Sequence, residues 1–170
     1  MQRNKGFSMI ELIVAIALLG IAVTLIGGSI TQIFSLDQRQ CANELNSAIS
    51  RCKIGAMSRA GDVYLKLSVS GDGVFCTYYE NDTQTEQRKI GKPTLTISYT
   101  DDAGVNHTVT EAAPLYLSFV RTTGAFLKVG DAQRLADPAA APADYYCETI
   151  HVGAYRVELI PVTGRHDVAR

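Results

Sequence analysis

The stretch Phe7-Ser-Met-Ile-Glu11-Leu-Ile-Val-Ala15 opens the apolar run that decides the fold of this chain of 170 residues. No charged side chain occurs from Leu12 to Leu36, and this run exceeds the roughly 20 residues that a helix needs to span a bilayer. We therefore predict a helix able to span a membrane. Glu11 is the single charge near its start. An acid inside a membrane costs about 2 to 3 kcal/mol, so we interpret Glu11 as a functional residue with a partner.

The residues before this run form a basic leader, Met1-Gln-Arg-Asn-Lys-Gly6. An ordinary secretory signal has a small-residue cleavage site after its apolar stretch, but polar residues simply follow this one. Any cleavage is therefore expected before the apolar run, where Gly6 is the only small residue. Arg3 and Lys5 predict a cytoplasmic N-terminus by the positive-inside rule, with the rest of the chain outside the cytoplasm.

The arrangement Lys5-Gly6-Phe7-Ser-Met-Ile-Glu11-Leu resembles the class III signal of type IV pilins and type II secretion pseudopilins. The resemblance implies that a prepilin peptidase cuts between Gly6 and Phe7 and methylates the new amino terminus of Phe7. Glu11 then lies one helical turn beyond a free amine. In a filament, Glu11 of one subunit would pair with the Phe7 amine of its neighbour, which offsets the desolvation of both charges. The alternative is a signal anchor whose lone glutamate is tolerated near the membrane interface.

The helical pattern continues beyond the apolar run. Apolar residues recur at helical spacing as one amphipathic stripe, made of Phe34, Cys41, Leu45, Ala48, Ile49, Cys52 and Ala56. We predict one helix from Ser8 to Arg59, with a bend or melted stretch at Gly27-Gly28, because a glycine inside a helix costs about 1 kcal/mol. The chain thus divides into a leader (1–6), a transmembrane and assembly helix (7–36), an amphipathic helix half (37–60) and a β-rich globular domain (61–170).

After Gly61 the pattern changes from helical to alternating, which indicates strands, and turn residues such as Gly71-Asp-Gly73 separate them. The predicted strands are 63–69 with 74–79, 94–100 with 105–110, 115–120 with 125–129, and 145–152 with 155–162. The expected fold class is α+β. A long N-terminal helix would pack its apolar stripe on one twisted antiparallel sheet, as in the pilin fold that the resemblance implies.

Two C-terminal segments are similar to the minor pseudopilin H and FimT-like group. They are Phe119-Val-Arg-Thr-Thr-Gly124, an F-x-x-x-x-G hairpin, and the closing segment from Tyr155 to Gly164-Arg165. Some FimT-like minor pilins bind DNA through basic residues at this final strand. The resemblance thus implies Arg165, His166 and Arg170 as candidate DNA contacts, together with Arg156. Asp167 stands where a second basic residue would help, and so few phosphate contacts predict weak binding.

The four cysteines are Cys41, Cys52, Cys76 and Cys147. Their even number in an exported domain allows two disulfides, while free buried thiols are the alternative. Cys41 and Cys52 would lie about 16 Å apart along an intact helix, so they cannot pair with each other. Any bridge would therefore join the helix to the sheet. Their spacing does not match a zinc site.

No catalytic or metal-binding motif is apparent, and we expect neither an enzyme nor a cofactor. His107, His151 and His166 lie in separate predicted segments, without an HExxH or GxSxG motif. Asp101-Asp102 is followed by Ala-Gly, where an aspartate caps its own turn. The net charge of −1 does not favour a nucleic-acid partner.

Residues 130–144 are predicted to form a loop without structure of its own, which is usually a contact surface or a mobile linker. The loop contains Asp131, Asp137 and Asp144. Their spacing matches no calcium motif, so we expect solvated acids and no metal site.

The resemblance implies a structural minor pilin or pseudopilin in a type IV pilus or type II secretion filament. Its partners would be other pilin subunits, prepilin peptidase, the inner-membrane assembly platform and, before assembly, membrane lipid. The globular domain would be extracytoplasmic, first on the inner membrane and then in the filament. The alternatives are a FimT-like minor pilin that binds DNA for uptake, and a membrane-anchored binding module that never polymerises.

Overall fold

The structure, a computed structural model, describes residues 9–141 and 143–170, and it describes residues 21–35 by their backbone alone. The chain divides into two units, residues 1–36 and residues 37–170. Helix α1 (Met9–Ser58) runs through both units. The predicted long helix is confirmed over its described residues. No melted stretch interrupts α1 at Gly27-Gly28.

Within the described residues of the globular unit, the strands form two antiparallel sheets. The first sheet has the order β3-β2-β1-β6 and contains Val63–Ser70 (β1), Gly73–Glu80 (β2), Thr83–Gly91 (β3) and Leu115–Ser118 (β6). The second has the order β5-β4-β7-β8-β9 and contains Ile97–Asp101 (β4), Asn106–Thr108 (β5), Cys147–Val152 (β7), Tyr155–Ile160 (β8) and Arg165–Ala169 (β9). A short helix, Val129–Arg134 (α2), separates β6 from β7 in the sequence.

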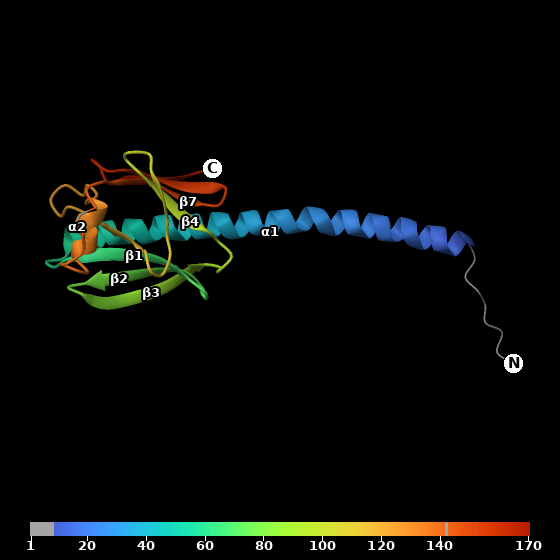
Figure 1. Cartoon of the computed structure of the whole chain (residues 1–170), viewed down its shortest axis with the longest axis horizontal. Helices are drawn as coiled ribbons and strands as arrows, with labels where there is room; N and C mark the ends of the chain where they lie inside the picture. Colours follow the sequence, from blue (N-terminus) through green and yellow to red (C-terminus); the bar gives the residue numbers. More distant parts are fainter. Residues whose placement is uncertain (1–8, 142) are drawn as a thin grey trace. The chain divides into compact units, whose positions relative to one another are not determined.

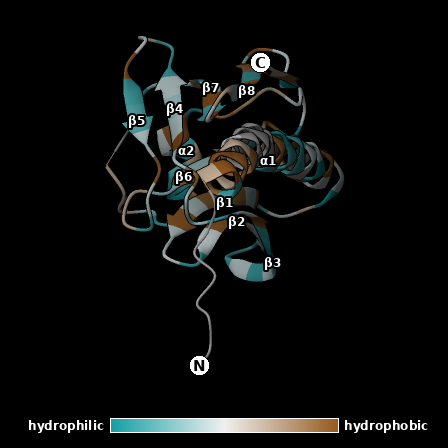
Figure 2. Cartoon of the chain, turned by 90° about the vertical axis from the view of Figure 1, so that its right-hand side faces the viewer, coloured by the Kyte–Doolittle hydropathy of each residue, from teal (hydrophilic) through white to brown (hydrophobic). Residues whose placement is uncertain are grey.

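The second half of α1, from Asp37 to Ser58, lies between these two sheets. Strands β1 to β3 are on one side of the helix, and β4, β7 and β8 are on the other (Figure 1, Figure 2). The predicted α+β class, with an N-terminal helix and antiparallel strands, is confirmed. The prediction of one sheet is wrong, because β6 returns to pair with β1 while β4 pairs with β7. The two groups of strands therefore remain separate and cover two sides of the helix.

The core is built around the predicted apolar stripe of α1. Cys41, Leu45, Ile49 and Cys52 are fully buried, and Ala42 joins them. Both sheets contribute fully buried side chains to the same cluster, namely Leu65, Leu67 and Val74 from the first and Ile97, Ile150, Val152 and Val157 from the second. Burying each large aliphatic side chain contributes about 1.5 to 3 kcal/mol. This two-sided burial holds the second half of α1 in the globular unit.

Strand β3 was missed, because it is polar and mostly exposed along its length. Ion pairs connect α1, and Arg59 just after it, to β3, to Lys92 and to the end of β2. These pairs are Asp37 with Lys92 (2.6 Å), Glu44 with Arg88 (3.1 Å), Arg51 with Glu86 (2.5 Å) and Arg59 with Glu80. The charge sign changes along α1 from acidic to basic and along its partners from basic to acidic. A shift in register would therefore bring like charges together.

We expect Glu44→Lys to lower the free energy of unfolding by about 0.5 to 1 kcal/mol, because it opposes Arg88 with a like charge on a partly exposed surface. Urea unfolding of the full chain measures the change. The double variant Glu44→Lys, Arg88→Glu should recover most of the loss. Glu111→Lys is the matched control, since Glu111 is exposed and outside the four pairs. An equal loss in this control would contradict a role for the pairing.

The C-terminal half also differs from the prediction. Strand β8 ends at Ile160, and residues 161–164 turn the chain into β9, so the closing segment is two strands instead of one. Helix α2 lies inside the region predicted as a loop without structure. It is too short for helical periodicity to show in the sequence. The amide of Gly130 donates to the carbonyl oxygen of Ala143 at 3.0 Å, which holds these two residues of the region together.

Candidate functional site

The first turns of α1 form an apolar surface without cover in this structure. Eight large apolar side chains of this segment are at least half exposed: Met9, Ile10, Leu12, Ile13, Val14, Ile16, Leu18 and Leu19. A contiguous exposed surface of this kind marks a site of contact with a membrane or with protein. The apolar residues lie all round the helix, which is typical of a helix that is buried in its working state.

Glu11 lies in the first turn of α1, among Ile10, Val14, Ala15 and Leu18. An acid in the first turn interacts favourably with the positive end of the helix dipole. Gly6 and Phe7, the predicted processing residues, lie outside the described residues. Among the residues that the structure does describe, no helix has the length and hydropathy of a membrane span.

The two C-terminal motifs meet at one place in the globular unit. Gly164 has a positive φ of 63°, and a Cβ atom on it would lie 1.8 Å from the carbonyl oxygen of Gly124. Lys53 of α1 donates from Nζ to the carbonyl oxygens of Thr163 (3.1 Å) and Gly164 (3.0 Å). The motif residues thus form a packing junction on α1. The sequence shows both glycines, but their contact could not be predicted from it.

Aromatic side chains complete this junction. The rings of Phe119 and Phe126 have centroids 4.3 Å apart, and the Phe126 ring meets the His166 ring edge-on at 6.3 Å. Gly124, the last residue of the motif, therefore packs against the turn before β9, whereas Phe119, the first, packs on Phe126, whose amide donates to the carbonyl oxygen of Pro161 in that turn. The contacts join the two motifs into one packed region of the globular unit.

The predicted DNA contacts do not form one free basic surface. Arg165 pairs with Asp167 at 2.8 Å, and Arg156 pairs with Glu158 at 2.7 Å. His166 is half-buried, with Nε2 2.7 Å from Ser50 Oγ on α1, and burial lowers its pKa. Arg170 is exposed at the chain end. Most of the positive charge expected at this strand is thus neutralised within the protein.

All four cysteines are free and buried in the structure, so the described residues contain no disulfide. Burial raises the pKa of the Cys41 and Cys52 thiols to about 12 and raises those of Cys76 and Cys147 as well. The thiolate is the reactive form of cysteine. These side chains therefore act as small apolar core residues.

The acids of the 130–144 region are engaged separately. Asp131 pairs with Arg134 and Asp144 pairs with Lys128, while Asp137 Oδ1 accepts from the amide of Ala139 at 3.0 Å. Across residues 9–141 and 143–170, the structure contains no cluster of histidine, cysteine, aspartate and glutamate that could hold a metal ion.

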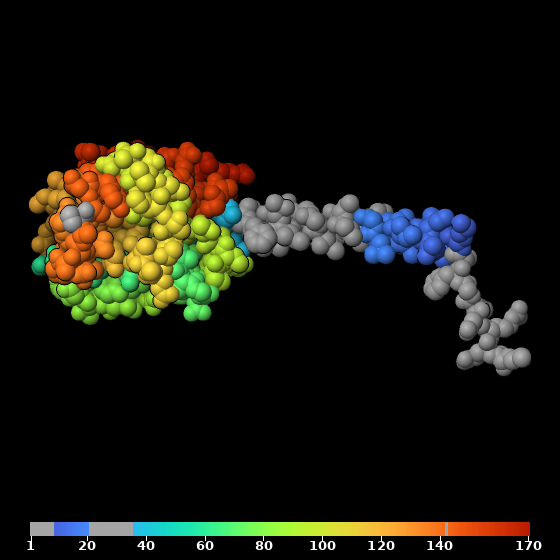
Figure 3. Space-filling view, in the orientation of Figure 1, coloured from blue at the N-terminus to red at the C-terminus, as the bar shows by residue number. Residues whose placement is uncertain are grey.

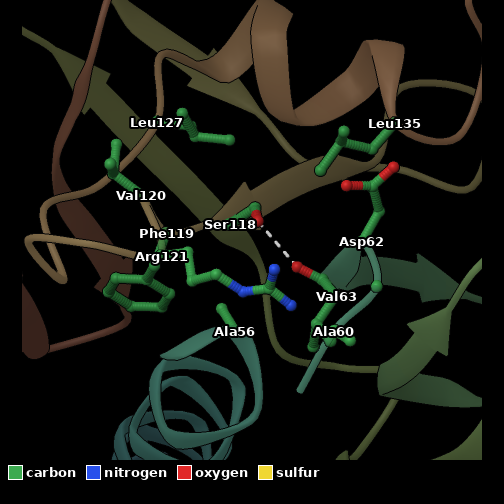
Figure 4. Close-up of a pocket in the computed structure, with 11 residues that line it drawn as sticks. Ala56, Ala60, Asp62, Val63, Ser118, Phe119, Val120, Arg121, Leu127 and Leu135 are labelled. Atoms are coloured by element: carbon green, nitrogen blue, oxygen red, sulfur yellow. Dashed lines mark hydrogen bonds between the residues drawn. The ribbon is translucent and has the colours of Figure 1, made fainter. Parts of the chain in front are cut away.

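A pocket of about 280 Å³ lies where the end of α1, the start of β1 and the segment after β6 meet (Figure 4). Ser118 Oγ donates to the carbonyl oxygen of Val63 at 2.6 Å, so its hydroxyl is committed to the backbone. Asp62 and Arg121 line the pocket together with apolar side chains such as Phe119. A nucleophilic site requires a base within hydrogen-bond reach of the nucleophile. No histidine lines this pocket, and the arrangement offers no such pair.

Comparison with known proteins identifies the N-terminal segment. Residues 1–27 match the family model described as the prokaryotic N-terminal methylation motif. This match supports a type IV pilin-like protein that is processed by prepilin peptidase. Neither the curated proteins nor the solved structures provide a match to the chain. The α+β arrangement of the globular unit is compatible with a pilin fold.

Proposed function

We propose that this protein is a structural, non-enzymatic subunit of a type IV pilus-like filament, a minor pilin or pseudopilin of a pilus or a type II secretion system. The observation that carries the proposal is the methylation motif at residues 1–27, which leads into the exposed apolar surface of α1. An apolar helix with an acid in its first turn suits a subunit that leaves the membrane for a filament core. The similarity of Phe119-x-x-x-x-Gly124 and Gly164-Arg165 to the minor pseudopilin H and FimT-like group supports a minor subunit.

The proposed assembly depends on the new amino terminus. Cleavage between Gly6 and Phe7 removes the leader and leaves the apolar helix attached to the globular unit. The free amine of Phe7 and the carboxylate of Glu11 are then four residues apart. In a stack of subunits, Glu11 pairs with the Phe7 amine of a neighbour and sets the register of the two helices. Pairing offsets the cost of taking each charge out of water.

The proposal also gives the location of the protein before it is assembled into a filament. The basic leader keeps the N-terminus in the cytoplasm, α1 anchors the chain in the inner membrane, and the globular unit is extracytoplasmic. Prepilin peptidase and the inner-membrane assembly platform act on it there, and other pilin subunits receive it. The globular unit selects its neighbours through exposed loops, where recognition residues are commonly found.

Mass spectrometry of the mature protein tests the processing step. In cells with an active prepilin peptidase, we expect the chain to begin at N-methylated Phe7. Deletion of the peptidase should leave Met1 to Gly6 in place, which provides the control. Retention of the leader in the presence of the active peptidase would rule out the proposed export route.

We do not propose DNA binding, because Arg165 and Arg156 are each paired with an acid on the same strand. A mobility-shift assay with duplex DNA at low salt should show no complex at micromolar protein, and Arg165→Ala should make no difference. Binding through phosphate contacts weakens steeply as the salt concentration rises. A salt-sensitive complex that Arg165→Ala weakens would therefore restore the FimT-like alternative.

A further inference from the structure

A cavity of about 560 Å³ lies in the globular unit between the β4–β5 hairpin and α2. Its walls are formed by Tyr99, His107, Tyr145, Val129 and Gln133, together with the edge of β5 and residues 112–114. Figure 3 shows the residues of the hairpin, in yellow, and those that follow α2, in orange, on the same face of this unit. Small-molecule sites usually occupy about 300 to 1,000 Å³. The proposed filament function does not use this cavity.

Three aromatic rings line one wall of the cavity. Tyr99 and His107 are opposite each other in the β4–β5 register, with ring centroids 4.8 Å apart and planes 19° apart. Tyr145 lies 5.1 Å from His107 with planes 10° apart. The amide of Val129 donates to the carbonyl oxygen of Tyr145 at 2.9 Å, which joins Tyr145 to the start of α2, and the Tyr145 hydroxyl lies 3.1 Å from that of Tyr99 on the hairpin. The three rings are therefore nearly parallel and supported from two sides.

A buried aspartate orients the histidine ring. Asp101 is only 4% exposed, and its side chain accepts from the amides of Ala103 (3.0 Å) and Val105 (2.8 Å) and from His107 Nε2 (2.9 Å). The His107 bond and the two amides lower the pKa of the Asp101 carboxyl. An ionised carboxylate only accepts, so Nε2 carries the proton. In the neutral ring, Nδ1 then remains as an acceptor.

The two tyrosines leave one hydroxyl hydrogen unused. Their hydroxyl oxygens are 3.1 Å apart, and one hydroxyl donates to the other. Burial, followed by this hydrogen bond, raises the pKa of Tyr99, so the hydroxyl stays protonated. One O–H of the pair remains available to a ligand. Gln133 adds an amide, which both donates and accepts.

The edge of β5 adds backbone groups. Val109 donates to Ile97 and Asp101 donates to Val105 across the hairpin. Because bonding alternates along an antiparallel pair, the backbone groups of Asn106 and Thr108 point away from β4. The cavity thus presents donors and acceptors together. No lysine, arginine, aspartate or glutamate is among its lining residues.

We propose that this cavity binds a neutral saccharide. A pyranose ring has a face of C–H groups that packs on an aromatic side chain. Its rim carries hydroxyls that each donate and accept. An anionic ligand would lack a cationic partner among the lining residues, and the carboxylate of Asp101, which holds His107, is already occupied by three donors. Strand β5 has three residues, and residues 112–114 wall the same cavity, which favours a compact ring over an extended peptide.

Saturation-transfer difference NMR on the purified full chain tests the proposal. The protein is held in a detergent without a sugar headgroup, because an alkyl glycoside would itself present the ligand. The probes are neutral methyl glycosides of hexoses and N-acetylhexosamines at millimolar concentration. We expect transfer to the ring protons of at least one probe. Gln133→Ala should weaken its binding about fivefold through the loss of one hydrogen bond. Gln87→Ala, an exposed glutamine on β3, should leave binding unchanged.

Tyr145→Leu removes one aromatic wall and should weaken binding at least about tenfold. Thermal unfolding confirms that each variant is folded, and Gln133→Ala alone decides the outcome if Tyr145→Leu does not fold. Three results would overturn the proposal. They are the absence of transfer to any glycoside, binding that neither Gln133→Ala nor the Tyr145 variant changes, and stronger binding of uncharged nucleosides or extended peptides than of glycosides.

Discussion

Glu11→Ala should leave cleavage after Gly6 unchanged yet almost abolish incorporation of the protein into filaments. In the proposed assembly, removing the carboxylate leaves the Phe7 amine of the neighbouring subunit buried without a counter-charge. Breaking a buried pair in this way costs about 3 to 5 kcal/mol. Since each 1.4 kcal/mol is a factor of about ten, we expect a loss of more than about a hundredfold. Immunoblots of sheared filaments against the membrane fraction measure it.

Two control variants separate charge from packing. Glu11→Gln keeps the size of the side chain and removes its charge, so it should fail as Glu11→Ala does. Val14→Ala removes apolar bulk from the same surface without touching the charge, and it should still be incorporated. Normal incorporation of Glu11→Gln would refute the pairing. If the processed parent protein itself never leaves the membrane fraction, the non-polymerising binding module becomes the better description.

Gly164→Ala should lower the free energy of unfolding by about 2 to 5 kcal/mol. A left-handed conformation costs an alanine about 1 to 2 kcal/mol, and overpacking a closed site costs about 1 to 3 kcal/mol more. The new Cβ would lie 1.8 Å from the Gly124 carbonyl oxygen, which belongs to backbone and cannot rotate away. Urea unfolding of the full chain, followed by circular dichroism, measures the loss.

Gly104→Ala isolates the conformational part of this effect. Gly104 also has a positive φ, of 81°, but no atom lies within 4 Å of its would-be Cβ. Gly104→Ala should therefore lower the free energy of unfolding by only about 1 to 2 kcal/mol. Equal losses at the two positions would show that the contact between the two motifs does not contribute to stability. A larger loss at Gly164 supports the packing junction.

Much of the α1 description could be predicted from the sequence. The charge-free run, the position of Glu11 and the buried stripe from Cys41 to Ala56 all depend on residues within a few turns of each other. The β1–β2 hairpin is similarly local, since Gly71-Asp-Gly73 lies between two alternating segments. A hydrophobic pattern with the period of a helix or a strand can be recognised directly from the spacing of apolar residues.

Elements without such a pattern were missed. Strand β3 is polar and exposed, and what holds it is pairing with β2 and charges on α1, such as Asp37 with Lys92, which is 55 residues away. Helix α2 is too short to show a period. The acids that pair with Arg165 and Arg156 are only two residues away in the sequence, whereas the burial of His166 against Ser50 of α1 depends on the tertiary structure.

By itself, the sequence determined the long apolar helix, its acidic residue and the methylation motif, since these depend on consecutive residues. The tertiary structure alone decided that two sheets enclose the second half of α1, that Gly124 meets Gly164, and that Tyr99, His107 and Tyr145 line one cavity. Each of these contacts joins segments far apart in the chain. His166, for example, reaches Ser50 across 116 positions. Such contacts form only when burial of the common core brings distant strands together, and no local periodicity encodes them.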